Sequence, residues 1–350
     1  MAQRTGSVQN SYDAARWKKT IMNVQPRYGF AAQDLAEAKQ WQRTLRRQFI
    51  KRLGGFPPTA APLQPRTVAH DEFEDYTRET VQFKSREGLF VFGYFLLPRN
   101  LPADSRLPAL ICLPGHGYGV DAVVGLDAFG QPRPADETEY HHDFALQAAR
   151  RGYAALAVEI LGFGRRREGE FEAGSNASSC QTLTGTAFML GETMAGWRVY
   201  DAMRAVDYLL TRPEVDPQRI GAMGISGGGL NTLYLAAVDT RIRAAVVSGF
   251  LNTFRNSIMS ISHCIDNFVP GLFLDTEMSD IAGLVAPRAL WCENGTADNI
   301  FPVEAFRRAL NDVKKIYKVF GVPKQCGGEV FEGRHQFYGV GAWKFLEKNL

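Results

Sequence analysis

Residues 220–229 read Ile-Gly-Ala-Met-Gly-Ile-Ser-Gly-Gly-Gly, and this stretch decides the fold class of the chain. An apolar run typical of a buried strand ends in the pattern Gly-x-Ser-x-Gly, and a helix-like pattern begins at Leu230. At such a junction the serine occupies a strained turn, and Gly224 and Gly228 let the strand and the helix approach closely. A glycine-rich turn whose serine only caps the helix is the alternative. The strand-to-helix position favours a nucleophilic Ser226.

Strand-like and helix-like patterns alternate on both sides of this stretch. Residues 80–85 and 89–97 predict an antiparallel hairpin, because both runs are rich in aromatic and branched side chains around a short turn. Further strands are expected at 109–113, 153–158, 219–225, 244–248, 289–293 and 329–331, and helices at 144–151, 196–211, 230–238 and 303–320. A closing helix is expected to start at His335. The alternation predicts a mostly parallel, doubly wound sheet with helices on both faces. Together with the Gly-x-Ser-x-Gly turn at Ser226, it predicts the α/β-hydrolase fold.

The first 65 residues have a different character. Apolar side chains recur at helical spacing between residues 34 and 53, and a stretch rich in glycine and proline follows up to Pro65. We therefore predict an N-terminal helical extension and linker over residues 1–65 and a catalytic domain over residues 66–350. Within that domain, residues 252–287 are expected to form an insertion near the active site.

A serine hydroxyl needs a base to take its proton and a carboxylate to orient that base. In this fold the partners follow the serine in the order acid, then histidine, each on a loop after a strand. Asp298 follows the strand at 289–293, and His335 follows the last short strand, so these two are the predicted partners of Ser226. Asp275 and Asp280 precede their strand and rank lower as candidates for the acid.

The reaction of such a serine puts negative charge on a carbonyl oxygen, which two backbone N–H groups can stabilise. Gly227 is the predicted source of one. Pro114-Gly115-His116-Gly117-Tyr118-Gly119 follows the strand at 109–113 and has the His-Gly pattern of the second donor loop, for which we expect Tyr118, with Gly117 as the alternative. A dinucleotide-binding turn is disfavoured, because the glycine spacing of such turns is absent.

Several side chains are candidates for contact with a substrate, although core packing is the more common fate of large apolar residues. These candidates are His116, His263, Phe268 and Trp197.

The composition places limits on the class of protein. Hydrophobic residues make up 45% and charged residues 22% of the 350 residues, and the net charge is +3, so a disordered chain is excluded and nothing indicates a nucleic-acid partner. Five scattered cysteines without a Cys-x-x-Cys pair predict free thiols, a reducing compartment and no metal site. Because the sequence shows neither a signal peptide nor a membrane span, we expect a cytoplasmic protein.

The chain resembles the dienelactone-hydrolase-like branch of the α/β-hydrolases that includes acetyl xylan esterases. The resemblance covers roughly residues 50–350 and rests on short motifs at residues 53–57, 114–117, 162–165, 212–216, 224–228, 286–288 and 295–298. It implies ester hydrolysis through an acyl-enzyme without a cofactor, with Ser226, Asp298 and His335 at the triad positions. Dienelactone hydrolases proper use a cysteine nucleophile, so the serine argues against dienelactone as the substrate.

The sequence therefore predicts a serine hydrolase that acts on a small carboxylic ester with a short acyl chain of the acetyl type. The expected partner is a small-molecule ester, and neither a membrane nor a nucleic acid is expected to bind. We expect no metal and no cofactor, and the chain is compatible with a homo-oligomer. Two alternatives stay open at this point: a serine peptidase of the prolyl-oligopeptidase type, and a non-catalytic binding protein on the same fold. The first is disfavoured because the N-terminal segment is too short for a β-propeller.

Overall fold

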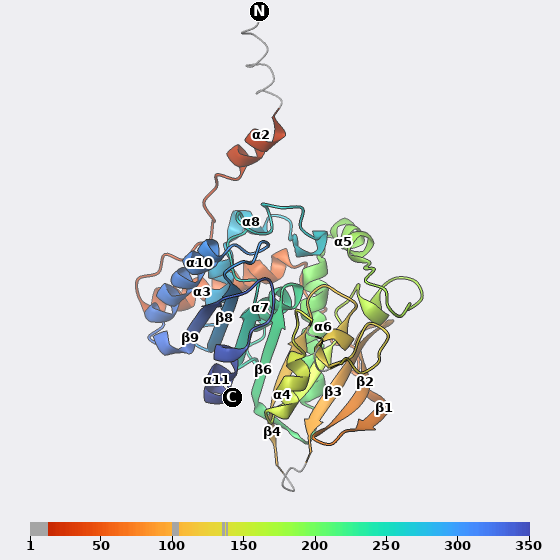
Figure 1. Cartoon of the computed structure of the whole chain (residues 1–350). Helices are drawn as coiled ribbons and strands as arrows, with labels where there is room; N and C mark the ends of the chain where they lie inside the picture. The colour runs from red at the N-terminus through yellow and green to blue at the C-terminus, as the bar shows by residue number, and fades with distance from the viewer. Residues whose placement is uncertain (1–12, 100–104, 135–136, 138) are drawn as a thin grey trace, which may run out of the picture.

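The computed structural model describes residues 13–99, 105–134, 137 and 139–350. Its centre is a nine-stranded sheet in the order β1-β2-β3-β5-β4-β6-β7-β8-β9 (Figure 1). The pairs β1–β2, β2–β3 and β3–β5 are antiparallel, and all pairs from β5 onward to β9 are parallel. The predicted mostly parallel sheet is therefore confirmed, with the predicted hairpin at its antiparallel edge.

The bounds of the elements are as follows. The strands are β1 (Arg66–Glu72), β2 (Tyr76–Arg86), β3 (Leu89–Pro98), β4 (Leu107–Leu113), β5 (Ala154–Val158), β6 (Val215–Ile225), β7 (Ala244–Ser248), β8 (Ala289–Gly295) and β9 (Cys326–Phe331). The α-helices are α2 (Ala14–Ile21), α3 (Leu35–Arg52), α4 (Phe144–Arg150), α5 (Cys180–Met189), α6 (Met194–Leu209), α7 (Gly227–Val238), α8 (Leu272–Asp275), α9 (Met278–Gly283), α10 (Val303–Val319) and α11 (Val340–Asn349). The 3₁₀ turns are η1 (Val120–Val123), η2 (Gly164–Arg166), η3 (Ile265–Asn267) and η4 (Pro323–Gln325).

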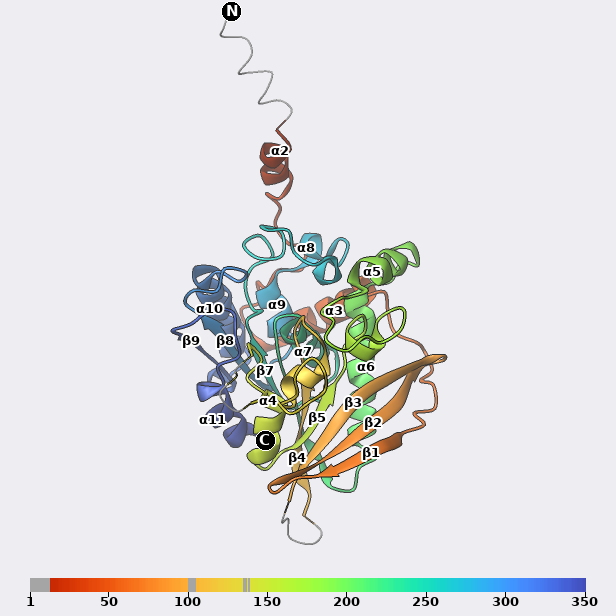
Figure 2. The same ribbon diagram turned by 45° about the vertical axis from the view of Figure 1, so that its right-hand side comes forward.

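Two hydrophobic cores cover the two faces of the sheet. One contains apolar side chains of α3, α6, α7, α9 and α10, and the other contains those of α4 and α11 (Figures 1 and 2). Strands β4, β5 and β7 lie between these layers, which explains why their sequences are apolar without alternation. Among the helices that the structure describes, none combines the length and apolar character that a membrane crossing requires.

The two N-terminal helices differ in how they relate to this core. Phe49 of α3 is 1% exposed and packs edge-on against Tyr234 of α7, with ring centroids 4.8 Å apart. Gln42 and Arg46 of the same helix donate hydrogen bonds to the carbonyls of Ala286 and Ala237. In contrast, α2 has no buried residue and projects from the body in both views (Figures 1 and 2), although its Lys18 contacts the body through a hydrogen bond to the carbonyl of Met259. The predicted helix at 34–53 is therefore present and belongs to the main core.

Besides the short helices α2, α8 and α9, which were not expected, the structure differs from the sequence-based expectations at three further places. β1 begins where the predicted catalytic domain begins, but no strand was expected there, and its side chains are almost all exposed because it is the edge strand. α5 was not expected, since its Thr- and Gly-containing sequence has little amphipathic pattern. The closing helix begins at Val340 rather than at His335, because Tyr338 and Gly339 donate their N–H groups to Glu293 and hold the intervening loop.

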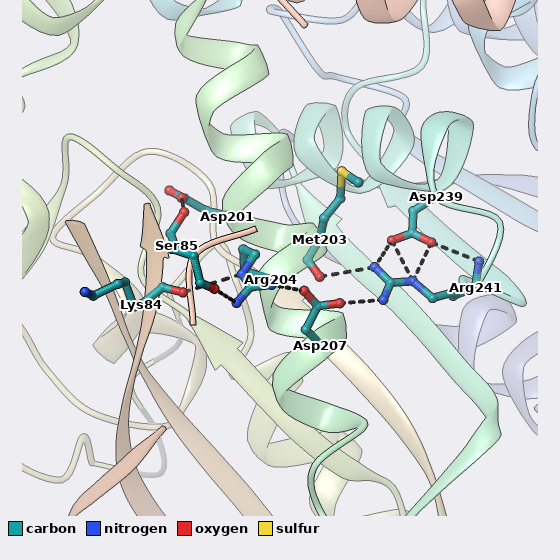
Figure 3. A network of polar contacts seen from close by, with 9 residues as sticks. Lys84, Ser85, Asp201, Met203, Arg204, Asp207, Asp239 and Arg241 are labelled. Carbon is teal, nitrogen blue, oxygen red and sulfur yellow. Dashed lines mark hydrogen bonds and ion pairs between the residues drawn. The ribbon is translucent and has the colours of Figure 1, made fainter. Parts of the chain in front are cut away.

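A chain of polar contacts links the hairpin to the helical layer (Figure 3). Arg204 of α6 donates to the carbonyl of Lys84 on β2 and forms an ion pair with Asp207. Asp207 in turn pairs with Arg241, 2.5 Å away, and Arg241 pairs with Asp239 after α7. This network joins the hairpin to α6 and to the end of α7, the helix that follows Ser226.

Candidate active site

Ser226 lies at the junction of β6 and α7, as predicted. Its φ of 57° and ψ of −121° are strained for a residue with a side chain. The neighbouring glycines are required there, since a methyl group on Gly228 would overlap the carbonyl oxygen of Leu113 on β4. The backbone thus has the geometry of a nucleophile elbow.

Asp298 and His335 are hydrogen-bonded to each other, with 2.7 Å between Asp298 Oδ2 and His335 Nδ1. The other oxygen of Asp298 accepts the N–H groups of Ile300 and Phe301, both at 2.9 Å, which fixes the carboxylate. His335 Nε2 is buried, and no described residue offers it a hydrogen bond. The imidazole is therefore oriented by the acid at one nitrogen and free to exchange a proton at the other.

Two aromatic rings stack against His335. Tyr140 stacks against it at 5.9 Å between centroids, and Phe301 stacks at 5.7 Å. Tyr140 also donates its hydroxyl to the carbonyl of His116, 2.6 Å away. Neither aromatic residue was predicted, because Tyr140 precedes α4 and Phe301 precedes α10, at positions without any motif.

Ser226 and His335 open into one pocket of about 310 Å³. The remaining lining comes from His116, Tyr140, Ile300 and the stretch 261–264 of the insertion. The pocket therefore brings together residues from six separate segments at the carboxyl ends of the parallel strands, the usual place for a site in this kind of sheet.

Two of the four predicted substrate-contact residues, His116 and His263, line this pocket. The other two lie elsewhere: the ring N–H of Trp197 donates to Glu192, and Phe268 lines a separate apolar hollow of about 340 Å³. The lower-ranked acids are also occupied elsewhere, since Asp275 pairs with Arg52 and Asp280 caps α9. Helical register and loop path, which the sequence pattern did not resolve, decide these placements.

The predicted donor loop lies beside the nucleophile. A side-chain carbon on Gly115 would lie 3.1 Å from Ser226 Cβ, and the Gly115 N–H itself donates to His141 Nε2 at 2.9 Å. The next three amides, of His116, Gly117 and Tyr118, donate to no residue in the described part of the chain. The Tyr118 hydroxyl donates to the carbonyl of Leu126. The Gly119 amide likewise donates to no described residue, so the loop offers four free amides, and among these four residues His116 is the one that lines the pocket.

A buried carboxyl lies behind this loop. Glu159 follows β5, is fully buried, and accepts the N–H of Val120 at 3.1 Å. Burial raises its pKa to about 8, with the nearby Asp121 adding to the shift. Gly119 and Gly164 pass so close to the carboxyl that any side chain there would collide with it. No role was predicted for this acid from the sequence, because Glu159 belongs to none of the motifs that indicate the site.

A sequence model of the family described as the abhydrolase family matches residues 13–331. The chain belongs to this family. Among proteins similar to this abhydrolase, the "Putative hydrolase YtaP" of Bacillus subtilis is 28% identical over 285 residues, which cover 79% of this chain and 88% of that protein.

Solved structures share its fold. A "putative acetyl xylan esterase" from Bacteroides fragilis superposes with a TM-score of 0.77 at 21% identity, covering 92% of this chain and 82% of that one. A glucuronoyl esterase from Solibacter usitatus superposes with a TM-score of 0.66 at 14% identity, covering 93% and 96%. The predicted α/β-hydrolase fold and superfamily of this abhydrolase are confirmed.

Proposed function

We propose that this abhydrolase hydrolyses carboxylic esters through an acyl-enzyme formed on Ser226. The observation that carries the proposal is that Ser226, on a strained elbow, shares one pocket with His335, which Asp298 orients at 2.7 Å. Structures of similar fold bear the names of esterases, which supports an ester over other acyl substrates.

In the proposed reaction, His335 Nε2 takes the hydroxyl proton of Ser226 while the serine oxygen attacks the ester carbonyl carbon. The oxyanion receives hydrogen bonds from the Gly227 N–H and from the 116–118 loop, for which Tyr118 and Gly117 are the predicted donors and His116 is a third candidate. The imidazolium then protonates the departing alcohol. A water molecule, deprotonated by His335, releases the acid from the serine.

The size of the pocket supports a small acyl group. A volume of about 310 Å³ is at the lower end of ligand sites, and it must also hold part of the alcohol. Ile261 and Ile300 provide apolar contacts, whereas polar contacts come from Ser262 and from the three histidines, His116, His263 and His335. We therefore expect acetyl-type esters to be cleaved faster than long-chain esters.

The test is hydrolysis of p-nitrophenyl acetate, butyrate and octanoate, with a chromogenic prolyl peptide measured alongside. Ser262→Ala is the matched control for Ser226→Ala, because both serines line the same pocket. We expect Ser226→Ala to abolish ester turnover, Ser262→Ala to keep most of it, and acetate to be preferred. Cleavage of the peptide without cleavage of the esters would contradict the proposal and would indicate a serine peptidase. Inertness to esters, to the peptide and to a serine-directed organophosphate would indicate a binding role.

A further inference from the structure

Four side chains with metal-binding atoms meet beside the pocket, and we call them the thiol cluster. Their ligand atoms all lie within 4.8 Å of one another, and the members are His116, Cys180, Cys264 and Asp266. They come from the donor loop after β4, from the first turn of α5 and from the insertion around η3. These segments are far apart in the sequence, so their cysteines do not form a motif with fixed spacing. The cluster was therefore not visible in the sequence, from which no metal site was expected.

We propose that the thiol cluster binds one divalent metal ion, of which zinc fits best. A tetrahedral zinc site with the usual bond lengths places its ligand atoms about 3.3 to 3.8 Å apart. In the cluster, Asp266 Oδ2 lies 3.0 Å from His116 Nε2 and 3.1 Å from Cys180 Sγ. These two pairs need to open by a few tenths of an ångström, and because no pair in the cluster is wider than 4.8 Å, the others need to close by about 1 Å or less to surround an ion.

The donor types select the metal. Two sulfurs, one imidazole nitrogen and one carboxylate oxygen form a set that suits zinc, whereas magnesium and calcium prefer oxygen ligands alone. Cys180 and Asp266 are buried, and His116 and Cys264 are half-buried at the pocket wall. An ion can therefore reach the cluster from the pocket and is shielded from solvent on the other sides.

The surroundings balance the charge of a bound ion. Arg198 is buried beside the cluster, with its guanidinium 2.5 Å from Asp266 Oδ2 and 3.4 Å from Cys180 Sγ. Two thiolates and one carboxylate would carry three negative charges, which a zinc ion and Arg198 together neutralise. The other oxygen of Asp266 accepts the amide of Asn267 at 2.7 Å. Arg198 and Asn267 thus act as outer partners that orient the ligands.

A bound ion would fasten the wall of the pocket. α5 packs against η3, and the ring of His116 lies against Gly227, where a side-chain carbon would be 2.9 Å from His116 Nδ1. The ion would join the donor loop, α5 and the insertion to one another. The contact of His116 with Gly227 places this junction next to Ser226. This role is structural, and the proposal does not depend on the esterase activity.

The experiment measures the metal content of the whole protein. The protein is purified in the presence of a reductant and without metal-affinity chromatography. We expect about one zinc per chain by mass spectrometry. After removal of zinc with a chelator, titration with Co²⁺ alone should produce thiolate-to-cobalt charge-transfer absorption, and Zn²⁺ should raise the Tm. In Cys180→Ser/Cys264→Ser we expect both metal content and absorption to fall at least tenfold.

Cys326→Ser is the matched control, because this buried cysteine lies on β9 outside the cluster, and it should keep the metal. If the double variant fails to fold, Asp266→Asn is measured instead, because asparagine has nearly the same shape as aspartate. We expect the same loss of metal content and of cobalt absorption. The proposal is overturned if the reduced wild type binds neither Zn²⁺ nor Co²⁺, or if the variants bind as well as the wild type.

Discussion

At the scale of single residues, Asp298 has two oxygens with separate partners. Oδ1 accepts two backbone N–H groups, and Oδ2 faces His335 Nδ1. An asparagine can keep the first contacts with its oxygen but must then present its amide to the histidine. A donor at that place favours the imidazole tautomer that cannot accept the serine proton.

We therefore expect Asp298→Asn to lower the kcat for p-nitrophenyl acetate on the order of 10⁴-fold, by analogy with the serine-protease triad. Its stability should change little, because the loop contacts of Oδ1 remain. Asp312→Asn, on the exposed face of α10, is the control and should behave like the wild type. A loss of less than about tenfold would remove Asp298 from the proposed triad.

At the scale of elements, the crossing of β6 and α7 determines whether the nucleophile is presented at all. A methyl group on Gly228 meets the backbone of Leu113 and Pro114, which cannot move without disrupting β4. We expect Gly228→Ala to lower the free energy of unfolding by at least about 2 to 3 kcal/mol, measured by urea denaturation. Gly185→Ala in α5 meets no atom within 4 Å and should be neutral or stabilising by up to about 1 kcal/mol. Equal effects of the two substitutions would contradict this account of the elbow.

The two N-terminal helices should respond differently to truncation of an apolar side chain. Phe49 of α3 is buried against Tyr234, so Phe49→Ala should cost about 3 to 5 kcal/mol. Ile21 of α2 is half exposed, and Ile21→Ala should change stability by less than about 0.5 kcal/mol. Thermal and urea unfolding check both values. A small effect at Phe49 would mean that α3 is an appendage and not part of the hydrolase core.

At the scale of the whole molecule, buried carboxyls make stability depend on pH. Burial raises the pKa of Glu159 to about 8, above its unfolded value of about 4.3, so the fold favours the protonated form. Its contribution to stability is fully present below the unfolded pKa and is lost as the pH rises through the folded pKa. Glu277 and Glu293, with burial raising their pKa to about 7, act in the same direction.

Replacement of Glu159 isolates one part of this dependence. Glu159→Gln can keep the hydrogen bond from Val120 but cannot ionise. Relative to the wild type, we expect its free energy of unfolding to rise between pH 5 and pH 8 by up to about 1.4 kcal/mol per pH unit. Urea denaturation at both pH values gives the difference. A variant whose pH profile runs parallel to that of the wild type would show that Glu159 ionises freely in the fold.

The sequence by itself determined the features that depend on local order along the chain. The apolar strand before Ser226 and the helix after it predict the elbow, because strand and helix periodicity and glycine sterics act within a few residues. The order of Ser226, Asp298 and His335 after successive strands follows, since parallel strands bring their carboxyl ends to one edge. The sheet, its hairpin and most helices were predicted for the same reason.

Only the tertiary structure decided which side chains from distant segments meet. The stacking of Tyr140 and Phe301 on His335, the burial of Glu159 behind the donor loop, and the assembly of the thiol cluster have no signal in sequence spacing. It also placed Trp197 and Phe268 outside the pocket that holds Ser226. Side-chain direction and loop path set these contacts. They depend on how whole layers pack, which local periodicity does not encode.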